Sequence, residues 1–397
     1  MNYPGVIAGD EEALAKIDAA RGRPIDGHAP GLSGTNLDAY IAAGVMSDHE
    51  CTTYEEAAEK LHKGMYIMLR EGSSEKNLQA LLPVVSDSTY TRCMLVVDDR
   101  SAVDLKNEGD IDHVVRRAIA MGMAPVRAVQ LATLSPAHYF RLHDRGFIGP
   151  GRKADLITID DLNEFQVDRV YRNGVLVAVA GNPLFDSPTP GAELTDSIHT
   201  GGTTLESLRL RHTGGEFPTI GLMPGQIVTR RLQCVPAVQD GNIVSDIDRD
   251  LLKLVVVERH HASGAVGKGL VHGFGLERGA LATSVAHDSH NLLAVGVTDE
   301  DILGAIHALE ESGGGLAVYA DGELKARLPL PVAGLLSQAP LARVLTDEQA
   351  VESAARALGK VPPAPFALLS FLALPVIPEL RITDKGVVDV SRFQIVA

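Results

Sequence analysis

Cysteine is scarce in this chain of 397 residues. Only Cys51, Cys93 and Cys234 occur, far apart and without a CxxC spacing. A disulfide framework needs more cysteines, and a thiolate zinc site needs them closer together, so the sequence argues against both. The scarcity predicts a reducing compartment, and we therefore expect a cytoplasmic protein.

Long apolar runs and long basic runs are also missing. No segment approaches the roughly 20 apolar residues that a membrane span needs, and the opening MNYPGVIAGDEEALAKI lacks the basic and apolar regions of a secretion signal. The 36 Lys and Arg residues stand against 51 Asp and Glu residues, which gives a net charge of -15. We therefore expect a soluble protein whose partners are neither nucleic acid nor membrane.

The first 145 residues alternate short apolar runs with longer helical patterns, which is typical of βα units around a parallel sheet. Tyr54–His62 is predicted to be one of the helices, with Thr52 or Thr53 as its N-cap. The predicted strands end in the segments IDGHAP (25–30), GVMSDHE (44–50), MYIMLREG (65–72) and CMLVVDDR (93–100).

After residue 146 the pattern changes to short alternating strands. Asn173-Gly174 predicts a hairpin turn between two of them. Residues 182–204 are rich in Pro, Gly, Ser and Thr, and they predict a linker. In the second half, strands are expected in LLKLVVVERH (251–260) and GLAVYADGEL (315–324), with helices over 299–312 and 347–358.

These patterns predict an α/β protein with three parts. The first is a partial βα barrel over residues 1–145. A β module with a linker follows over residues 146–195, and a separate α/β domain covers residues 196–397.

The functional side chains of a parallel βα barrel lie at the carboxyl ends of its strands. Those ends present His28, His49 and Asp98, with Glu71 and Ser73 at the third strand end. Two imidazoles and a carboxylate are suitable ligands for a divalent ion such as zinc, manganese or iron. A metal lowers the pKa of its bound water, and a carboxylate beside it can accept the proton. The sequence therefore predicts a metal site at this edge of the sheet.

Each of these residues also has a structural interpretation. A single histidine at a strand end, such as His28, is often a hydrogen-bonded loop residue. Asp98 and Asp99 are compatible with a solvated turn or a helix cap, and Glu71 with an ion pair to Arg70. It is the succession of His28, His49 and Asp98 on neighbouring strand ends that favours the metal site.

At these residues the chain resembles the amidohydrolase superfamily and, within it, the bacterial adenine deaminases. The resemblance lies in DGHAPGLSG, SDHECTTYEEAAEKLHKGM, MLREGSSEKNLQAL and VVDDRSAVDL, and continues through ATLSPAHYFRLHDRGFIGPGRKADL. VHGFGLERGALATSVAHDSHNLLAVG and ALPVIPELRIT resemble the C-terminal domain of that family.

The resemblance implies a fold, a reaction and a set of site residues. The first 145 residues would be strands five to eight of a (β/α)8 barrel, in which His28 and His49 hold the second metal of a binuclear site. Asp98 would ligate the first metal and shuttle a proton while adenine is hydrolysed to hypoxanthine and ammonia. The implied cofactor is a divalent metal, Mn²⁺ first, with Fe²⁺ or Zn²⁺ as alternatives.

The chain departs from the family pattern because it has neither the HxH pair of barrel strand one nor the metal-bridging glutamate of strand four. We therefore expect a truncated or split-gene product without the first four strands, with uncertain activity on its own. Four βα units cannot close a barrel, and their open edges favour a homodimer or a second chain that supplies strands. The alternatives are an inactive remnant that binds purine or a partner chain, and a hydrolase of another cyclic amide.

A second polar cluster, in SVAHDSHNLLAVG, belongs to the C-terminal half. It is compatible with a loop that contributes to a purine pocket or binds an ion, and equally with a hydrogen-bonded turn network. The residues predicted by position to contact the purine are Glu71, Ser73, Asn77, His287, Asp288, His290 and Asn291.

Overall fold

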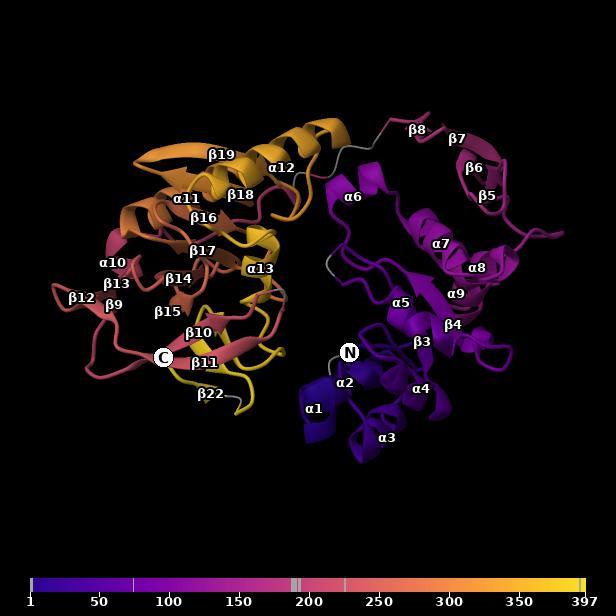
Figure 1. Cartoon of the computed structure of the whole chain (residues 1–397), viewed down its shortest axis with the longest axis horizontal. Coiled ribbons are helices and arrows are strands. Elements are labelled where there is room, and N and C mark those ends of the chain that lie inside the picture. Colours follow the sequence, from indigo (N-terminus) through magenta and orange to yellow (C-terminus); the bar gives the residue numbers. More distant parts are fainter. Residues whose placement is uncertain (1–2, 74, 187–190, 192–193, 225, 393) are drawn as a thin grey trace. The chain divides into compact units, whose positions relative to one another are not determined.

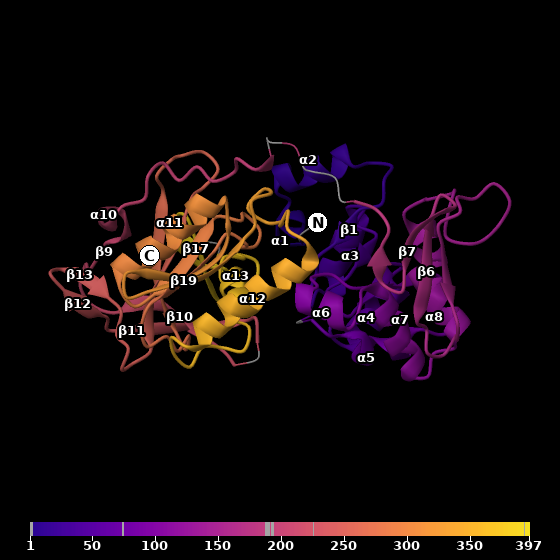
Figure 2. The same ribbon diagram turned by 90° about the horizontal axis from the view of Figure 1, so that it is seen from above.

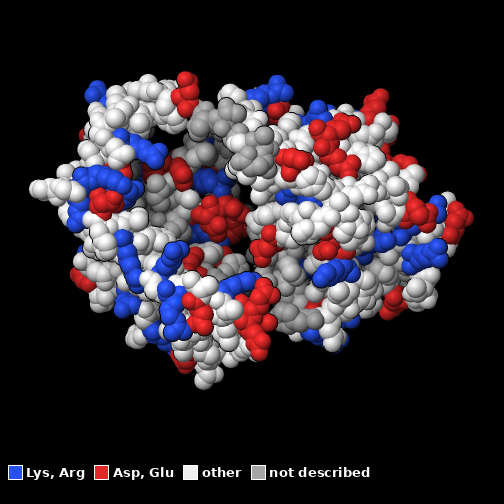
Figure 3. Space-filling view, turned by 180° about the vertical axis from the view of Figure 1, so that it is seen from behind, with Lys and Arg blue, Asp and Glu red and all other residues white. Residues whose placement is uncertain are grey.

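The computed structural model describes the whole chain except residues 1–2, 74, 187–190, 192–193, 225 and 393 (Figure 1). The chain forms two compact units, an N-terminal unit over Met1–Ser187 and a C-terminal unit over Pro188–Ala397. Acidic and basic side chains are interspersed on the face seen in Figure 3. No helix among the described residues is both long enough and apolar enough to cross a membrane.

The N-terminal unit is built on a four-stranded parallel sheet whose spatial order follows the chain. Its strands are β1 (Asp26–Gly27), β2 (Ser47–Asp48), β3 (Tyr66–Arg70) and β4 (Cys93–Val96). Its helices are α1 (Tyr3–Ala8), α2 (Glu11–Ala19), α3 (Gly34–Ala42), α4 (Tyr54–His62), α5 (Leu78–Leu81), α6 (Ala102–Asn107), α7 (Ile111–Ala120), α8 (Pro125–Ala132) and α9 (Leu134–Tyr139), with 3₁₀ turns η1 (Leu82–Val84) and η2 (Tyr90–Arg92). Strands alternating with helices confirm the predicted α/β class.

Burial explains why this sheet forms. Helices α4, α7 and α8 pack on β3 and β4, and the core on that side includes the fully buried Ile67, Leu69 and Cys93. Met68 and Met94 face the other side, where they pack with Tyr139 of α9. Both faces of the two longer strands are therefore covered, as parallel sheets require.

Local signals set the ends of the elements. Helix α4 has the predicted bounds, and the Glu56 backbone N–H donates to the Thr53 hydroxyl at its N-cap, 3.3 Å away.

The β module consists of β5 (Leu156–Ile159), β6 (Val167–Arg172), β7 (Val175–Val179) and β8 (Asn182–Pro183) in an antiparallel sheet. Asn173 and Gly174 both have positive φ between β6 and β7, which confirms the predicted hairpin turn.

The C-terminal unit contains an eight-stranded mixed sheet in the order β11-β10-β15-β14-β17-β16-β18-β19 and two three-stranded sheets. Helix α11 packs on β16, β17 and β18, and α11 and β17 are labelled in Figure 2. The strands are β9 (Leu210–Arg211), β10 (Phe217–Leu222), β11 (Thr229–Cys234), β12 (Ala237–Gln239), β13 (Asn242–Val244), β14 (Leu251–Val257), β15 (Val266–His272), β16 (Ala280–Thr283), β17 (Leu292–Gly296), β18 (Gly315–Ala320), β19 (Glu323–Pro329), β20 (Leu380–Thr383), β21 (Gly386–Asp389) and β22 (Gln394–Ile395). The helices are α10 (Leu205–Leu208), α11 (Asp299–Ser312), α12 (Leu341–Arg356) and α13 (Pro365–Phe371).

Two predictions for this unit need correction, whereas the helix over 299–312 is confirmed. GLAVYADGEL is not one strand, because Asp321 and Gly322 form a positive-φ turn that divides it between β18 and β19. The helix predicted over 347–358 begins earlier, at Leu341, and follows Pro340. The apolar pattern alone did not reveal its more exposed first turns.

Candidate metal centre

His28 and His49 follow two neighbouring strands directly. In the parallel pairing of β1 with β2, Gly27 lies opposite Asp48, so the next residue of each strand is a histidine at the same sheet edge. A Cβ on Gly27 would lie 2.3 Å from the Ser47 carbonyl oxygen, so glycine is needed for this close approach. The two imidazole centroids are 5.6 Å apart.

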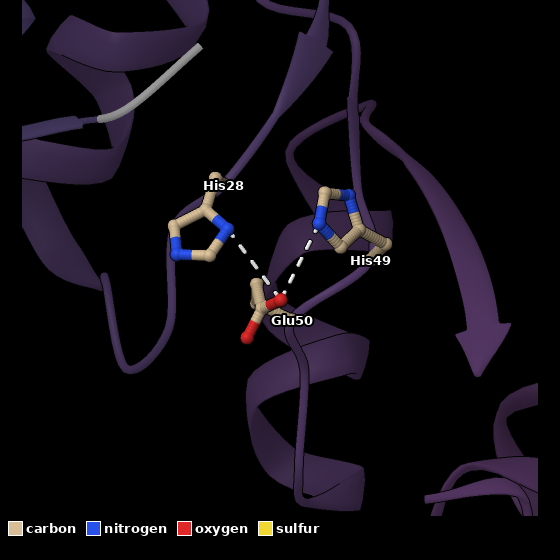
Figure 4. Close-up of side chains that lie close together, drawn as sticks. All are labelled: His28, His49 and Glu50. Atoms are coloured by element: carbon tan, nitrogen blue, oxygen red, sulfur yellow. Dashed lines mark ion pairs between the residues drawn. The ribbon is translucent and has the colours of Figure 1, made fainter. Parts of the chain in front are cut away.

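Glu50 joins the two histidines (Figure 4). Its Oε1 lies 3.4 Å from His28 Nδ1 and 3.3 Å from His49 Nε2. One ligand atom from each of the three residues falls within 4.8 Å of the others. Two imidazoles and a carboxylate in this arrangement have the chemistry and spacing to hold a divalent ion.

Sequence reasoning missed Glu50. In a continuing strand it would point away from His49, because successive side chains alternate between the faces. Strand β2 ends at Asp48, however, so the alternation does not extend to Glu50. The available signal was an acidic residue next to a candidate histidine at a strand end.

Asp26 orients His49 from the side opposite Glu50. His49 Nδ1 lies 3.0 Å from Asp26 Oδ2, which leaves Nε2 directed toward Glu50. Burial opposes the charge on His49, but its hydrogen bonds to Asp26 and Glu50 outweigh that effect and raise its pKa to about 10. Because an imidazole ligand must be deprotonated, a metal would displace a proton here.

Arg70 connects the histidine cluster to Asp98. Its Nη1 lies 2.5 Å from Glu50 Oε1 and 2.7 Å from Asp98 Oδ2. Burial opposes ionisation of Glu50, but His49 and Arg70 lower its pKa to about 2. Asp98 has a left-handed backbone (φ 62°) beyond β4 and a one-third-exposed side chain. It lies outside the convergent group of three and contacts that group through Arg70.

The residues of this unit that are predicted to contact the purine lie close to β3. Glu71 is buried, and its carboxylate lies 3.0 Å from Arg117 Nε and accepts from the Leu78 N–H at 3.2 Å. The Ser73 hydroxyl accepts from the Ser101 N–H at 2.8 Å. Asn77 Oδ1 accepts from Arg70 Nη2 at 3.4 Å, which places Asn77 beside the cluster.

The predicted purine contacts among residues 287–291 belong to the C-terminal unit. The His287 and His290 rings are 5.7 Å apart, and His287 also contacts the Phe371 ring. His290 Nδ1 accepts from the Ala286 N–H at 3.2 Å, and Asn291 Oδ1 accepts from the Arg259 N–H at 3.3 Å. These bonds build a turn, and Asp288 is exposed on it. Their role in purine binding stays a prediction.

A second group of potential ligands, Asp48, Cys51 and Glu56, lies beneath the His28 loop. The ammonium of the fully buried Lys60 contacts Asp48 at 2.8 Å and Glu56 at 2.7 Å. Asp48 in turn accepts from the Ala29 N–H at 3.0 Å. Lys60 also donates to the Ala29 carbonyl at 2.7 Å, so this group supports the loop that carries His28.

Comparison with known proteins agrees with this architecture. The amidohydrolase family model matches residues 1–177, and the adenine deaminase C-terminal domain model matches residues 226–394. The chain is 53% identical over its whole length to an adenine deaminase of Dehalococcoides mccartyi, of which it covers 70%. It is 47% identical to adenine deaminase 2 of Carboxydothermus hydrogenoformans, with the same coverage.

Among solved structures, the crystal structure of enamidase, an amidohydrolase superfamily member, matches 44% of this chain and 53% of its own at 17% identity, with a TM-score of 0.36. The family assignment rests on the sequence matches instead. They extend over the whole chain and include the histidines of the N-terminal unit as well as the distinctive C-terminal unit. On this evidence the chain belongs to the adenine deaminase family.

Proposed function

We propose that this chain hydrolyses adenine to hypoxanthine and ammonia with the help of a divalent metal ion. The observation that carries the proposal is the convergence of His28, His49 and Glu50 at the carboxyl edge of the parallel sheet. We infer the substrate from the relatives, which are named adenine deaminases and match the whole of this chain.

The donor set fits a divalent ion of the first transition row. Imidazole nitrogens suit Zn²⁺ and Fe²⁺, and a carboxylate oxygen adds preference for the harder Mn²⁺. We propose Mn²⁺, held by His28, His49 and Glu50. When bound, such an ion lowers the pKa of water and so supplies a nucleophile at neutral pH.

Asp98 is the candidate proton carrier. It is more exposed than Glu50, and Arg70 holds it beside the cluster. Deamination forms a bond from a water oxygen to the ring carbon and breaks the bond from that carbon to the amino nitrogen. We assign to Asp98 the acceptance of a proton from water and its delivery to the departing ammonia. Asn77 is the candidate purine contact, because it is anchored to the same arginine.

The sheet edges point to a second polypeptide. We propose that β1 to β4 correspond to strands five to eight of a barrel and that their free edges pair within a homodimer. Strands β1 and β4 each have only one neighbour among the described strands, and parallel edges left open are templates for pairing. Light scattering on the purified chain checks this, and a monomer at micromolar concentration would argue against it.

Ammonia release from adenine in the presence of Mn²⁺ tests the activity. Asp98→Asn should reduce kcat by roughly 100-fold or more, the usual contribution of a general acid and base. Asp99→Asn is the matched control, because it makes the same change at the neighbouring, exposed residue. A wild-type chain that binds Mn²⁺ but releases no ammonia would refute the proposal. Equal losses of kcat in both variants would show that Asp98 is not the proton carrier.

A further inference from the structure

A chain of hydrogen bonds runs from His49 into the core of the N-terminal unit. His49 Nδ1 contacts Asp26 Oδ2 at 3.0 Å, and Ser47 Oγ donates to Asp26 Oδ1 at 2.6 Å. The Tyr139 hydroxyl lies 2.6 Å from Ser47 Oγ. We infer that Asp26, Ser47 and Tyr139 are positioning residues, which fix the ring and tautomer of His49 so that its Nε2 is presented to a metal ion. The inference rests on the proposed function.

The direction of each bond follows from the donors available. Ionised Asp26 can only accept, so the Ser47 proton is directed to it. Tyr139 must then donate to Ser47, and burial, which raises the pKa of Tyr139 to about 12, keeps its proton in place. At the other end, Nδ1 of His49 must carry a proton to reach Asp26. The remaining nitrogen, Nε2, is therefore the one that can bind a metal.

This chain of hydrogen bonds is anchored in the packed core of the N-terminal unit. Ser47 is completely buried and Tyr139 is 3% exposed. Tyr139 belongs to α9, far from β2 in sequence, and its ring packs against that of Tyr66 at 4.9 Å between centroids. Groups held in this way lose little freedom when a ligand binds. Outer contacts of this kind to a metal-binding histidine typically change metal affinity by about 10- to 100-fold.

Asp26→Asn tests the tautomer directly. Oδ1 of Asp26 accepts from both Ser47 Oγ and the Gly27 N–H, so the oxygen of an asparagine should stay there. Its NH₂ group would then face His49 Nδ1, which would have to accept. The proton of a neutral His49 would move to Nε2 and block the metal-binding position.

The experiment measures Mn²⁺ affinity and the visible spectrum of bound Co²⁺ in the purified chain. We expect Asp26→Asn to lower Mn²⁺ affinity by about 10- to 100-fold and to change the Co²⁺ bands, with the melting temperature nearly unchanged. Tyr139→Phe should weaken binding less. Tyr66→Phe is the matched control, because it removes a hydroxyl from the neighbouring ring and leaves the hydrogen bonds between His49 and Tyr139 intact. This variant should bind Mn²⁺ as the wild type does.

The outcomes distinguish the positioning role from the proposed function on which it rests. If the wild type binds Mn²⁺ and Asp26→Asn binds it equally well, the positioning role alone is overturned. If the wild type binds neither ion, the proposed metal function fails and the positioning role fails with it. Equal weakening by Tyr66→Phe and Tyr139→Phe would assign the effect to packing and would also overturn the inference.

Discussion

Each unit contains a pair of close histidines with nearly the same geometry. The His28 and His49 rings are 5.6 Å apart at 63°, and the His287 and His290 rings are 5.7 Å apart at 60°. Their surroundings differ. Glu50 lies within 3.4 Å of both histidines of the first pair, whereas no such convergent carboxylate is found for the second pair among the described residues.

The charges nearby set the two pairs apart further. His49 has Asp26 and Glu50 as partners, and its pKa is raised. Burial lowers the pKa of His290, and the neighbouring His287 and Arg259 lower it further. Histidine spacing alone therefore does not identify a metal site. The carboxylates around the ring decide whether it can attract a cation.

The largest expected effect comes from removing the cation beneath the first pair. Lys60→Met would leave the fully buried Asp48 and the partly buried Glu56 without their ammonium. Breaking the buried Lys60–Asp48 ion pair in this way costs about 3–5 kcal/mol of unfolding free energy. Lys63→Met is the control at a more exposed ion pair, where about 1 kcal/mol at most is expected. Urea unfolding measures both, and equal losses would contradict the role given to Lys60.

The second test compares the two histidine pairs directly. His49→Ala removes a proposed ligand and should lower Mn²⁺ affinity by more than an outer-contact change, on the order of 100-fold or more. His290→Ala should leave that affinity unchanged, because His290 is already engaged by the Ala286 N–H. Calorimetric titration with Mn²⁺ measures both variants. A large loss in His290→Ala would show that the second pair also binds the ion.

The sequence was informative about this site where the chain is regular. The βα pattern predicted that His28 and His49 would follow neighbouring strands, and helix α4 has its predicted bounds because Thr53 provides a local cap. Glu50 could not be predicted in the same way. Its position depends on where β2 ends, which tertiary packing decides.

The hydrogen-bond chain shows the same limit more strongly. Ser47 and Tyr139 are 92 residues apart, and no local pattern relates them. In the C-terminal unit, Asp321-Gly322 resembled part of a strand because the apolar residues continue on both sides of the turn. Periodicity predicts which face a residue shares with its neighbours, but long-range contacts and short turns require the folded structure.

The smallest expected effect concerns pH and the second pair. The pKa of His290 is lowered in the folded chain, whereas the unfolded chain keeps a value near 6.5. As the pH falls below 6.5, the unfolded state therefore takes up a proton before the folded state does, and stability decreases. His290→Gln keeps an acceptor for the Ala286 N–H but cannot be protonated, so it should lose less stability between pH 7.5 and 5.5 than the wild type. Urea unfolding at the two pH values measures this difference, and an identical pH dependence in the variant would show that burial and the charge of Arg259 do not govern this histidine.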